Sequence, residues 1–198
     1  AAVVSGRLPI ERVRDAAARV RALGASAPGV PATPAVIEPK GDLVPLARLI
    51  AEFEVSDAAH ARLAAAGRIG TIVRIDTVAN IAVGVAPWGP FADASAEHTW
   101  LDHAPIIAVS RETPLTDPVA LAGPVLVVGK DLHRHESATA TIDALRAVRD
   151  DVVTVDMGWP AADRAFVDIA TFGASRLVGA ALIDLIAASV TLAPAEAP

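Results

Sequence analysis

The first part of the chain carries apolar residues spaced as on one face of a helix. Ile10, Val13, Ala17 and Val20 recur at intervals of three or four, while Arg12, Arg14, Arg19 and Arg21 fall mostly at other positions. Because a helical turn holds about 3.6 residues, this spacing predicts an amphipathic helix. The pattern ends near Gly24, so we predict that residues 1–24 form one helical segment.

A proline-rich stretch follows this helix. Pro28, Pro31, Pro34 and Pro39 all fall within residues 25–41. Proline at that density can continue neither a helix nor a central strand, because it fixes φ and lacks an amide N–H. The stretch therefore predicts a linker that sets the first helix apart from the rest of the chain.

The rest of the chain alternates short apolar runs with helical patterns. The runs predicted as strands are GTIVRID, APIIAVS, GPVLVVG and DVVTVD, and NIAVGVAPWG is a further strand or an extended bend. The predicted helices are 43–53, 57–66, SATATIDALRAV and GASRLVGAALIDLIAA, with Ser56 and Ser137 as the caps of the second and third. Near-continuous apolar runs are typical of strands buried on both faces. We therefore predict that residues 42–192 form an α/β fold, a three-layer αβα sandwich with a mostly parallel sheet, and that 193–198 form a disordered tail.

Composition excludes several classes of protein. Although 53% of the residues are hydrophobic, Asp184 interrupts the last apolar segment, so we predict no membrane span. The net charge of -6 and the lack of a long basic run argue against nucleic acid as a partner. The chain has no cysteine, which excludes disulfides and cysteine-ligated zinc but leaves the compartment open, cytoplasmic or exported.

Polar and aromatic residues gather where the predicted strands end. In an open parallel sheet, ligands bind beyond the carboxyl ends of the strands. Three segments lie at these ends: residues 87–89, the loop GKDLHRHES, and DMGWP. The candidate site or interface residues in them are Trp88, Asp131, His133, His135, Asp156 and Trp159.

The acids and histidines among these candidates allow more than one kind of site. Asp131, His133 and His135 alternate, and two imidazoles with a carboxylate suit zinc or iron. The alternative is a polar loop that caps the next helix. Asp131 and Asp156 are also candidates for the carboxylate pair of a glycosidase. The alternative is that these strand-end acids accept hydrogen bonds from loop amides.

The remaining candidates are equally open. Trp88 and Trp159 each fit a sugar-stacking platform or an aromatic plug at a domain interface. Lys130, His133 and Arg134 lie beside a predicted helix start, where an anion could bind. The chain contains neither GxGxxG nor GxxxxGK[ST], so we expect no nucleotide and no other cofactor.

Three segments resemble glycoside hydrolase family 3, in particular its actinobacterial β-N-acetylhexosaminidase-like members. SGRLPIERVRDAAARVRALG resembles the helix that closes the catalytic (β/α)8 barrel and leads into a linker. NIAVGVAPWG resembles a Pro-Trp-Gly segment of the second domain, and DMGWPAADRAFVDIATFGASRLVGAALIDLI resembles the end of that domain. The resemblance spans nearly the whole chain. It implies that 1–24 are a stub helix of the barrel domain and that 42–192 are the C-terminal α/β sandwich.

The chain departs from the family where the family's chemistry lies. N-acetylglucosaminidases of the family carry a nucleophilic aspartate on a barrel strand and a barrel loop like K-H-F-P-G-H-G, which supplies a histidine acid/base. No such loop occurs here, and the 24 residues before the linker fall far short of a barrel of about 250 residues. No catalytic residue is therefore carried over, and Asp156 is expected in a loop that faces the barrel.

The resemblance thus implies a non-catalytic domain of a retaining enzyme that hydrolyses terminal β-N-acetylglucosaminides. Its expected partners are its own (β/α)8 barrel and, in the whole protein, the carbohydrate substrate. Two alternatives stay open. One is an independent module that binds a sugar or an anion, and the other is a metal-dependent hydrolase that uses Asp131, His133 and His135.

Overall fold

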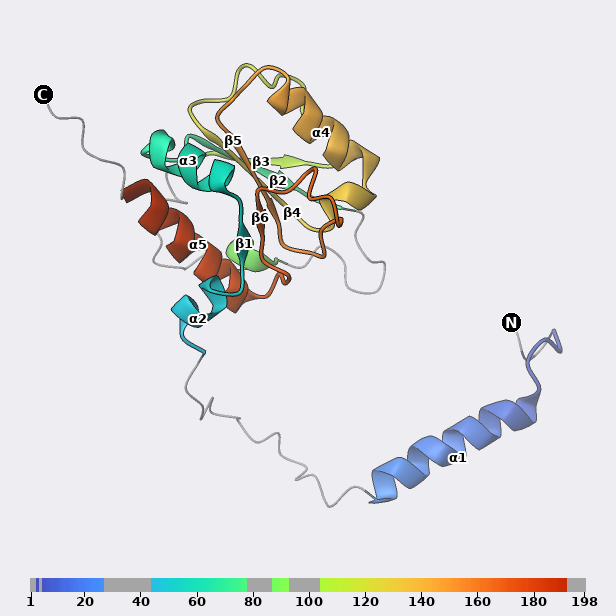
Figure 1. Ribbon diagram of the computed structural model, residues 1–198. Helices are drawn as coiled ribbons and strands as arrows, with labels where there is room; N and C mark the ends of the chain where they lie inside the picture. The colour runs from blue at the N-terminus through green and yellow to red at the C-terminus, as the bar shows by residue number, and fades with distance from the viewer. Residues whose placement is uncertain (1–2, 4, 27–43, 78–86, 93–103, 192–198) are drawn as a thin grey trace, which may run out of the picture. The chain divides into compact units, whose positions relative to one another are not determined.

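The computed structural model describes residues 3, 5–26, 44–77, 87–92 and 104–191 (Figure 1). The chain divides into two compact units, Ala1–Asp42 and Leu43–Pro198. Three predicted segments lie outside the described residues: the linker from residue 27 onward, the NIAVGVA run and the tail 193–198.

The first unit contains one helix, α1 (Ile10–Ser26), within its described residues. The helix ends two residues after Gly24, where the apolar spacing stops. Asp15 and Arg19 form an ion pair of 2.9 Å one turn apart, which favours the helix modestly. The predicted apolar stripe is exposed within this unit, and Val20 is 68% exposed.

The second unit is built on a twisted sheet. Its described strands are β1 (Glu54–Val55), β2 (Thr71–Ile75), β3 (Ile106–Val109), β4 (Val125–Gly129), β5 (Val152–Asp156) and β6 (Ile169–Ala170). They lie in the order β1-β6-β5-β4-β2-β3. All neighbouring strands are parallel except the edge pair β1 and β6, which is antiparallel. The prediction of a mostly parallel sheet is therefore confirmed.

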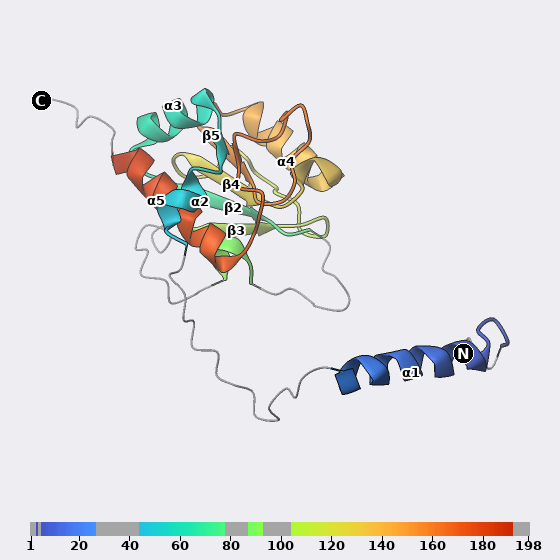
Figure 2. The ribbon, with the colours of Figure 1, turned by 60° about the horizontal axis from the view of Figure 1, so that its bottom comes forward.

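Helices cover both faces of this sheet (Figures 1 and 2). The described helices are α2 (Leu46–Ile50), α3 (Asp57–Ala66), α4 (Glu136–Arg146) and α5 (Arg176–Thr191), with 3-10 turns η1 (Gly89–Phe91) and η2 (Leu132–Arg134). Helix α4 packs on one face, and α3 and α5 pack on the other, where α2 contacts α5. The predicted αβα sandwich is therefore confirmed. None of the described helices is long and apolar enough to cross a membrane.

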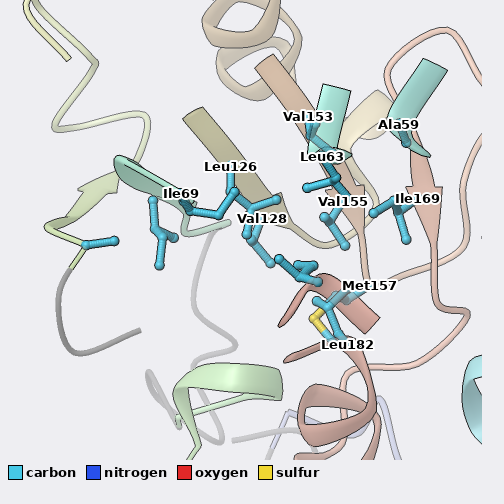
Figure 3. Packing of buried hydrophobic residues seen from close by; sticks show 13 residues of the cluster. Ala59, Leu63, Ile69, Leu126, Val128, Val153, Val155, Met157, Ile169 and Leu182 are labelled. Carbon is cyan, nitrogen blue, oxygen red and sulfur yellow. The ribbon is translucent and has the colours of Figure 1, made fainter. Parts of the chain in front are cut away.

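The core consists of two hydrophobic clusters, one on each face of the sheet. In β4, Leu126 and Val128 belong to the cluster under α3 and α5, whereas Val125 and Val127 belong to the cluster under α4. Figure 3 shows the first cluster, in which Leu63 of α3 meets strand residues. Because successive strand side chains point to opposite faces, a continuous apolar run supplies both clusters at once.

Local signals account for the other differences from the predictions. Ser56 caps α3 as predicted, since its hydroxyl accepts the N–H of Ala59 at 3.1 Å. Ser137 is not a cap, because α4 begins one residue before it and His135 takes the cap position without a side-chain hydrogen bond. Strands β1 and β6 were not predicted, because each has only two residues, too few to show the alternation of apolar and polar positions that indicates a strand.

Candidate functional site

The strand order places a crevice at the carboxyl ends of β2 and β4. The chain runs from β2 to β3 on one side and then returns to β4 on the other side of β2. In open α/β sheets, this reversal of strand order opens a crevice in which ligands bind. Asp76 follows β2 directly, and Lys130 and Asp131 follow β4, so these loops border the crevice.

Asp156 ends β5 and lies opposite Gly129 in the register of β4 and β5. Its side chain is fully buried, with 0% exposed. One carboxylate oxygen, Oδ1, accepts the N–H groups of Asp131 (2.8 Å) and Gly158 (2.7 Å). The other, Oδ2, accepts the N–H of Leu132 at 2.9 Å. The carboxylate is thus occupied by three backbone donors and does not reach solvent, as expected of a strand-end acid that holds a loop.

Asp131 returns the same kind of contact to the loop after β5. Its Oδ1 accepts the N–H of Trp159 at 2.9 Å. Its backbone has a φ of 50°, a left-handed conformation that aspartate tolerates better than most residues. A Cβ on Gly158 would lie 2.5 Å from the Asp131 nitrogen, so only glycine fits there. Asp156 thus holds the loop after β4, and Asp131 holds the loop after β5. The two carboxylates do not face each other across an open site, as the pair of a glycosidase would.

Trp159 lies at the surface beside two strained residues. It is 67% exposed and makes an edge contact with Phe172, with 5.5 Å between ring centroids. The Arg164 guanidinium lies over the Phe172 ring, 5.9 Å from its centroid. Arg164 and Phe172 have φ values of 55° and 54°, a conformation that non-glycine residues adopt mostly where the surrounding structure requires it. The sequence placed Trp159 among the candidates but gave no sign of these two neighbours.

Arg164 also forms a forked ion pair with Glu54 of β1. Its Nε donates to Oε2 at 2.8 Å and its Nη2 to Oε1 at 3.1 Å. These hydrogen bonds lower the pKa of Glu54 below its ordinary value, and the attraction of opposite charges adds to them, while desolvation opposes the shift. The same hydrogen bonds raise the pKa of Arg164. The pair joins edge strand β1 to the loop before β6.

Trp88 differs from Trp159 in that its ring is already covered. It is half-buried, packs against the core cluster and makes an edge contact with Phe91 at 5.2 Å. The Lys130 ammonium lies 4.7 Å from the centroid of its ring. Because a cation occupies a ring face, this geometry favours the interface-plug interpretation of Trp88 over the sugar-platform one. Of the two tryptophans that the structure describes, Trp159 is the one whose ring remains available.

The two candidate histidines do not assemble a metal site with Asp131. The Nδ1 atom of His133 is buried and has no hydrogen-bond partner in the described part of the chain. His135 precedes α4 and lines a cavity. Across the described ranges, no three His, Asp or Glu side chains lie where they could hold a metal ion. The alternating residues of DLHRH therefore do not point to one common side as metal ligands would, because the segment forms the 3-10 turn η2 rather than an extended strand.

Asp168 is a buried acid that the sequence did not single out. It is 9% exposed, and it accepts hydrogen bonds from Arg62 of α3 (3.0 Å), Arg146 of α4 (3.2 Å) and the N–H and hydroxyl of Thr154 (both 2.8 Å). Since α3 and α4 lie on opposite faces, this carboxylate ties the two outer layers across the sheet. The signal was an acid inside an apolar run, VDIA, just before the unpredicted strand β6.

Two cavities lie near these loops. One, of about 440 Å³, is bordered by the segments after β2 and β3 and by the start of α4, and His135 is the candidate residue that lines it. The other, of about 460 Å³, lies beside β1 and β6 and is lined by Glu54, Arg164 and Asp168. The first coincides with the crevice that the strand order predicts.

Comparisons of the chain with protein-family models, curated proteins and solved structures find no match. The resemblance to glycoside hydrolase family 3 therefore rests on the three sequence segments alone. What the site can do follows from its own geometry: two interlocked strand-end loops, an exposed tryptophan and a crevice lined by charged residues.

Proposed function

We propose that this chain is a non-catalytic C-terminal domain of a glycoside hydrolase that removes terminal β-N-acetylglucosamine with retention of configuration. The observation that carries the proposal is the state of Asp156. A retaining glycosidase needs two carboxyl groups that reach the scissile bond from opposite sides. Asp156 is fully buried under three backbone N–H groups and Asp131 binds the Trp159 amide, so their geometry supports a structural role.

The proposed partner is a catalytic (β/α)8 barrel of the same protein. The exposed apolar stripe of α1 supports this partner, because an amphipathic helix gains most of its stability from packing its apolar face. The exposed ring of Trp159 also supports it, since aromatic side chains are enriched at interfaces and at sugar sites. Trp159 would therefore lie on the face that borders the barrel and its sugar.

The proposal is tested by incubating the purified chain with an aryl β-N-acetylglucosaminide. We expect no turnover above buffer, because Asp156 is buried under three backbone N–H groups and Asp131 binds the Trp159 amide, so these two carboxylates do not form a catalytic pair. Asp131→Asn and Asp156→Asn variants serve as controls for a contaminating enzyme, whose trace activity would be the same in all preparations. Turnover that disappears in either variant would contradict the non-catalytic role.

A further inference from the structure

The cavity of about 440 Å³ lies where the sheet favours a ligand. Asp76 and Thr77 border it from the end of β2, and the segment after β3 and the start of α4 form its other walls. Strand β2 has β3 on one side and β4 on the other, so the reversal of strand order falls here. The volume lies within the usual range of small-molecule pockets, about 300–1,000 Å³. Position and size therefore both indicate a binding site.

Two guanidinium groups line this cavity. Arg111 follows β3 and Arg134 precedes α4, and both side chains are exposed. Among the described residues, neither is recorded in an ion pair. Asp76, in contrast, already binds Arg74 through contacts of 2.7 to 3.0 Å that join both groups side by side. The two unpaired cations favour an anionic group on the ligand.

The first turn of α4 adds to this preference. His135 holds the cap position but makes no side-chain hydrogen bond to the helix end. The first amide N–H groups of a helix have no partner within the helix, and they favour negative charge. Ser137 lies in this turn and also lines the cavity. An anion bound by Arg134 would therefore also lie near these donors.

The cavity also carries groups that a bare anion would not satisfy. Glu112 and Glu136 line it, as do Thr77 and Ser137, whose side chains carry hydroxyl groups. Carboxylates repel an anion but accept hydrogen bonds from hydroxyl groups. A ligand that combines one anionic group with several hydroxyls fits both sets of residues. The lining thus favours a sugar phosphate over inorganic phosphate and over a neutral sugar.

We propose that this cavity binds a phosphorylated sugar, with the phosphate held by Arg111 and Arg134 and the sugar hydroxyls directed at Glu112 and Glu136. The site uses only residues of the second unit. It therefore does not depend on whether the chain serves a glycoside hydrolase, and its failure would leave that proposal untouched.

Calorimetry on the full chain tests the site with three probes: glucose 6-phosphate, inorganic phosphate and glucose. We expect saturable binding of glucose 6-phosphate, with at least tenfold weaker binding of each of the other two. The double variant Arg111→Gln/Arg134→Gln should bind glucose 6-phosphate at least tenfold more weakly. Arg48→Gln, which removes an exposed arginine from α2, is the matched control and should change the Kd less than twofold.

The same experiment can overturn the proposal in two ways. No saturable binding of glucose 6-phosphate, or equal binding by the double variant, would remove the site. Binding of inorganic phosphate as tight as that of glucose 6-phosphate would remove the role of the carboxylates and hydroxyls. Both arginines are exposed, so the variants should have the same Tm as the parent chain. The single variant Arg111→Gln provides a second, milder test.

Discussion

Replacing Asp156 by asparagine changes one buried carboxylate into an amide of nearly the same shape. The amide oxygen can keep the two N–H groups of Asp131 and Gly158 that Oδ1 accepts. The amide nitrogen then faces the N–H of Leu132, which Oδ2 accepts at 2.9 Å in the parent. Two donors would oppose each other in a buried position, and the other two hydrogen bonds would lose their charge.

The expected cost follows from these contacts. A hydrogen bond to a charged group contributes about 1.5–3 kcal/mol, and a buried donor left without an acceptor costs about 1–3 kcal/mol. We therefore expect Asp156→Asn to lower the free energy of unfolding by about 3 kcal/mol. For a domain of this size, that corresponds to a Tm lower by about 6–12 °C. Asp156→Ala, which removes all three acceptor contacts, should cost about 5 kcal/mol.

Urea denaturation followed by circular dichroism measures this difference. The matched control is Asp163→Asn in the same loop, where an exposed carboxylate accepts the N–H of Ala165 at 3.1 Å and an amide oxygen can replace it. We expect the control to change the free energy of unfolding by no more than about 0.5 kcal/mol. If Asp156→Asn were as mild as the control, the structural role of this carboxylate would be refuted.

Three further predictions concern packing, pH and the exposed tryptophan. Gly179→Ala should destabilise the chain by about 3 kcal/mol in urea, because the new Cβ would lie 2.2 Å from backbone of η1, whereas Gly173→Ala meets only an ordinary contact; equal effects would contradict this. Glu54→Gln should lower the Tm at neutral pH. Because pairing with Arg164 lowers the pKa of Glu54, the difference from the parent should shrink as the pH falls below 4.5 and the carboxylate protonates; a difference that does not shrink as the pH is lowered would contradict the pairing. Trp159→Ala should change the free energy of unfolding by about 1 kcal/mol or less, since the residue is 67% exposed, and a larger loss in urea would place this residue in the core.

The sequence predicted the central sheet because its strands are buried on both faces. Strand β4 is an unbroken apolar run, and β5 is nearly so, with Thr154 as its one polar residue before Asp156. Both strands supply the two core clusters, and such runs favour a strand buried on both faces. The short strands β1 and β6 could not be predicted in the same way. Each holds two residues, and their pairing depends on long-range contacts such as the one between Glu54 and Arg164.

The candidate site shows a similar division. The sequence brought Asp131, Asp156 and Trp159 to one edge of the sheet, and the structure joins them through hydrogen bonds. It could not show that Asp156 is buried, because the partners are backbone N–H groups whose direction depends on the loop. The sequence also could not distinguish the two candidate tryptophans, Trp88 and Trp159, since the difference lies in Lys130, whose ammonium lies over the ring of Trp88.

The crevice residues that follow β2 and β3 directly were missed for another reason, whereas Arg134 and His135 were already singled out from the sequence. Sequence reasoning applied the rule of carboxyl ends to residues 87–89 and to the loops after β4 and β5, but not to the residues directly after β2 and β3. Asp76 and Arg111 follow these strands within two residues, and both line the cavity of about 440 Å³. The order of the strands, which decides where the crevice opens, is not encoded in any local pattern.

The relation to a catalytic barrel is tested most directly by sequencing the reading frame upstream of Ala1. We predict a (β/α)8 barrel of about 250 residues that ends in α1 and carries a loop like K-H-x-P-G-H. A start codon close to Ala1 would contradict this prediction. The chain would then be a free-standing α/β module whose function must be sought in its own crevice.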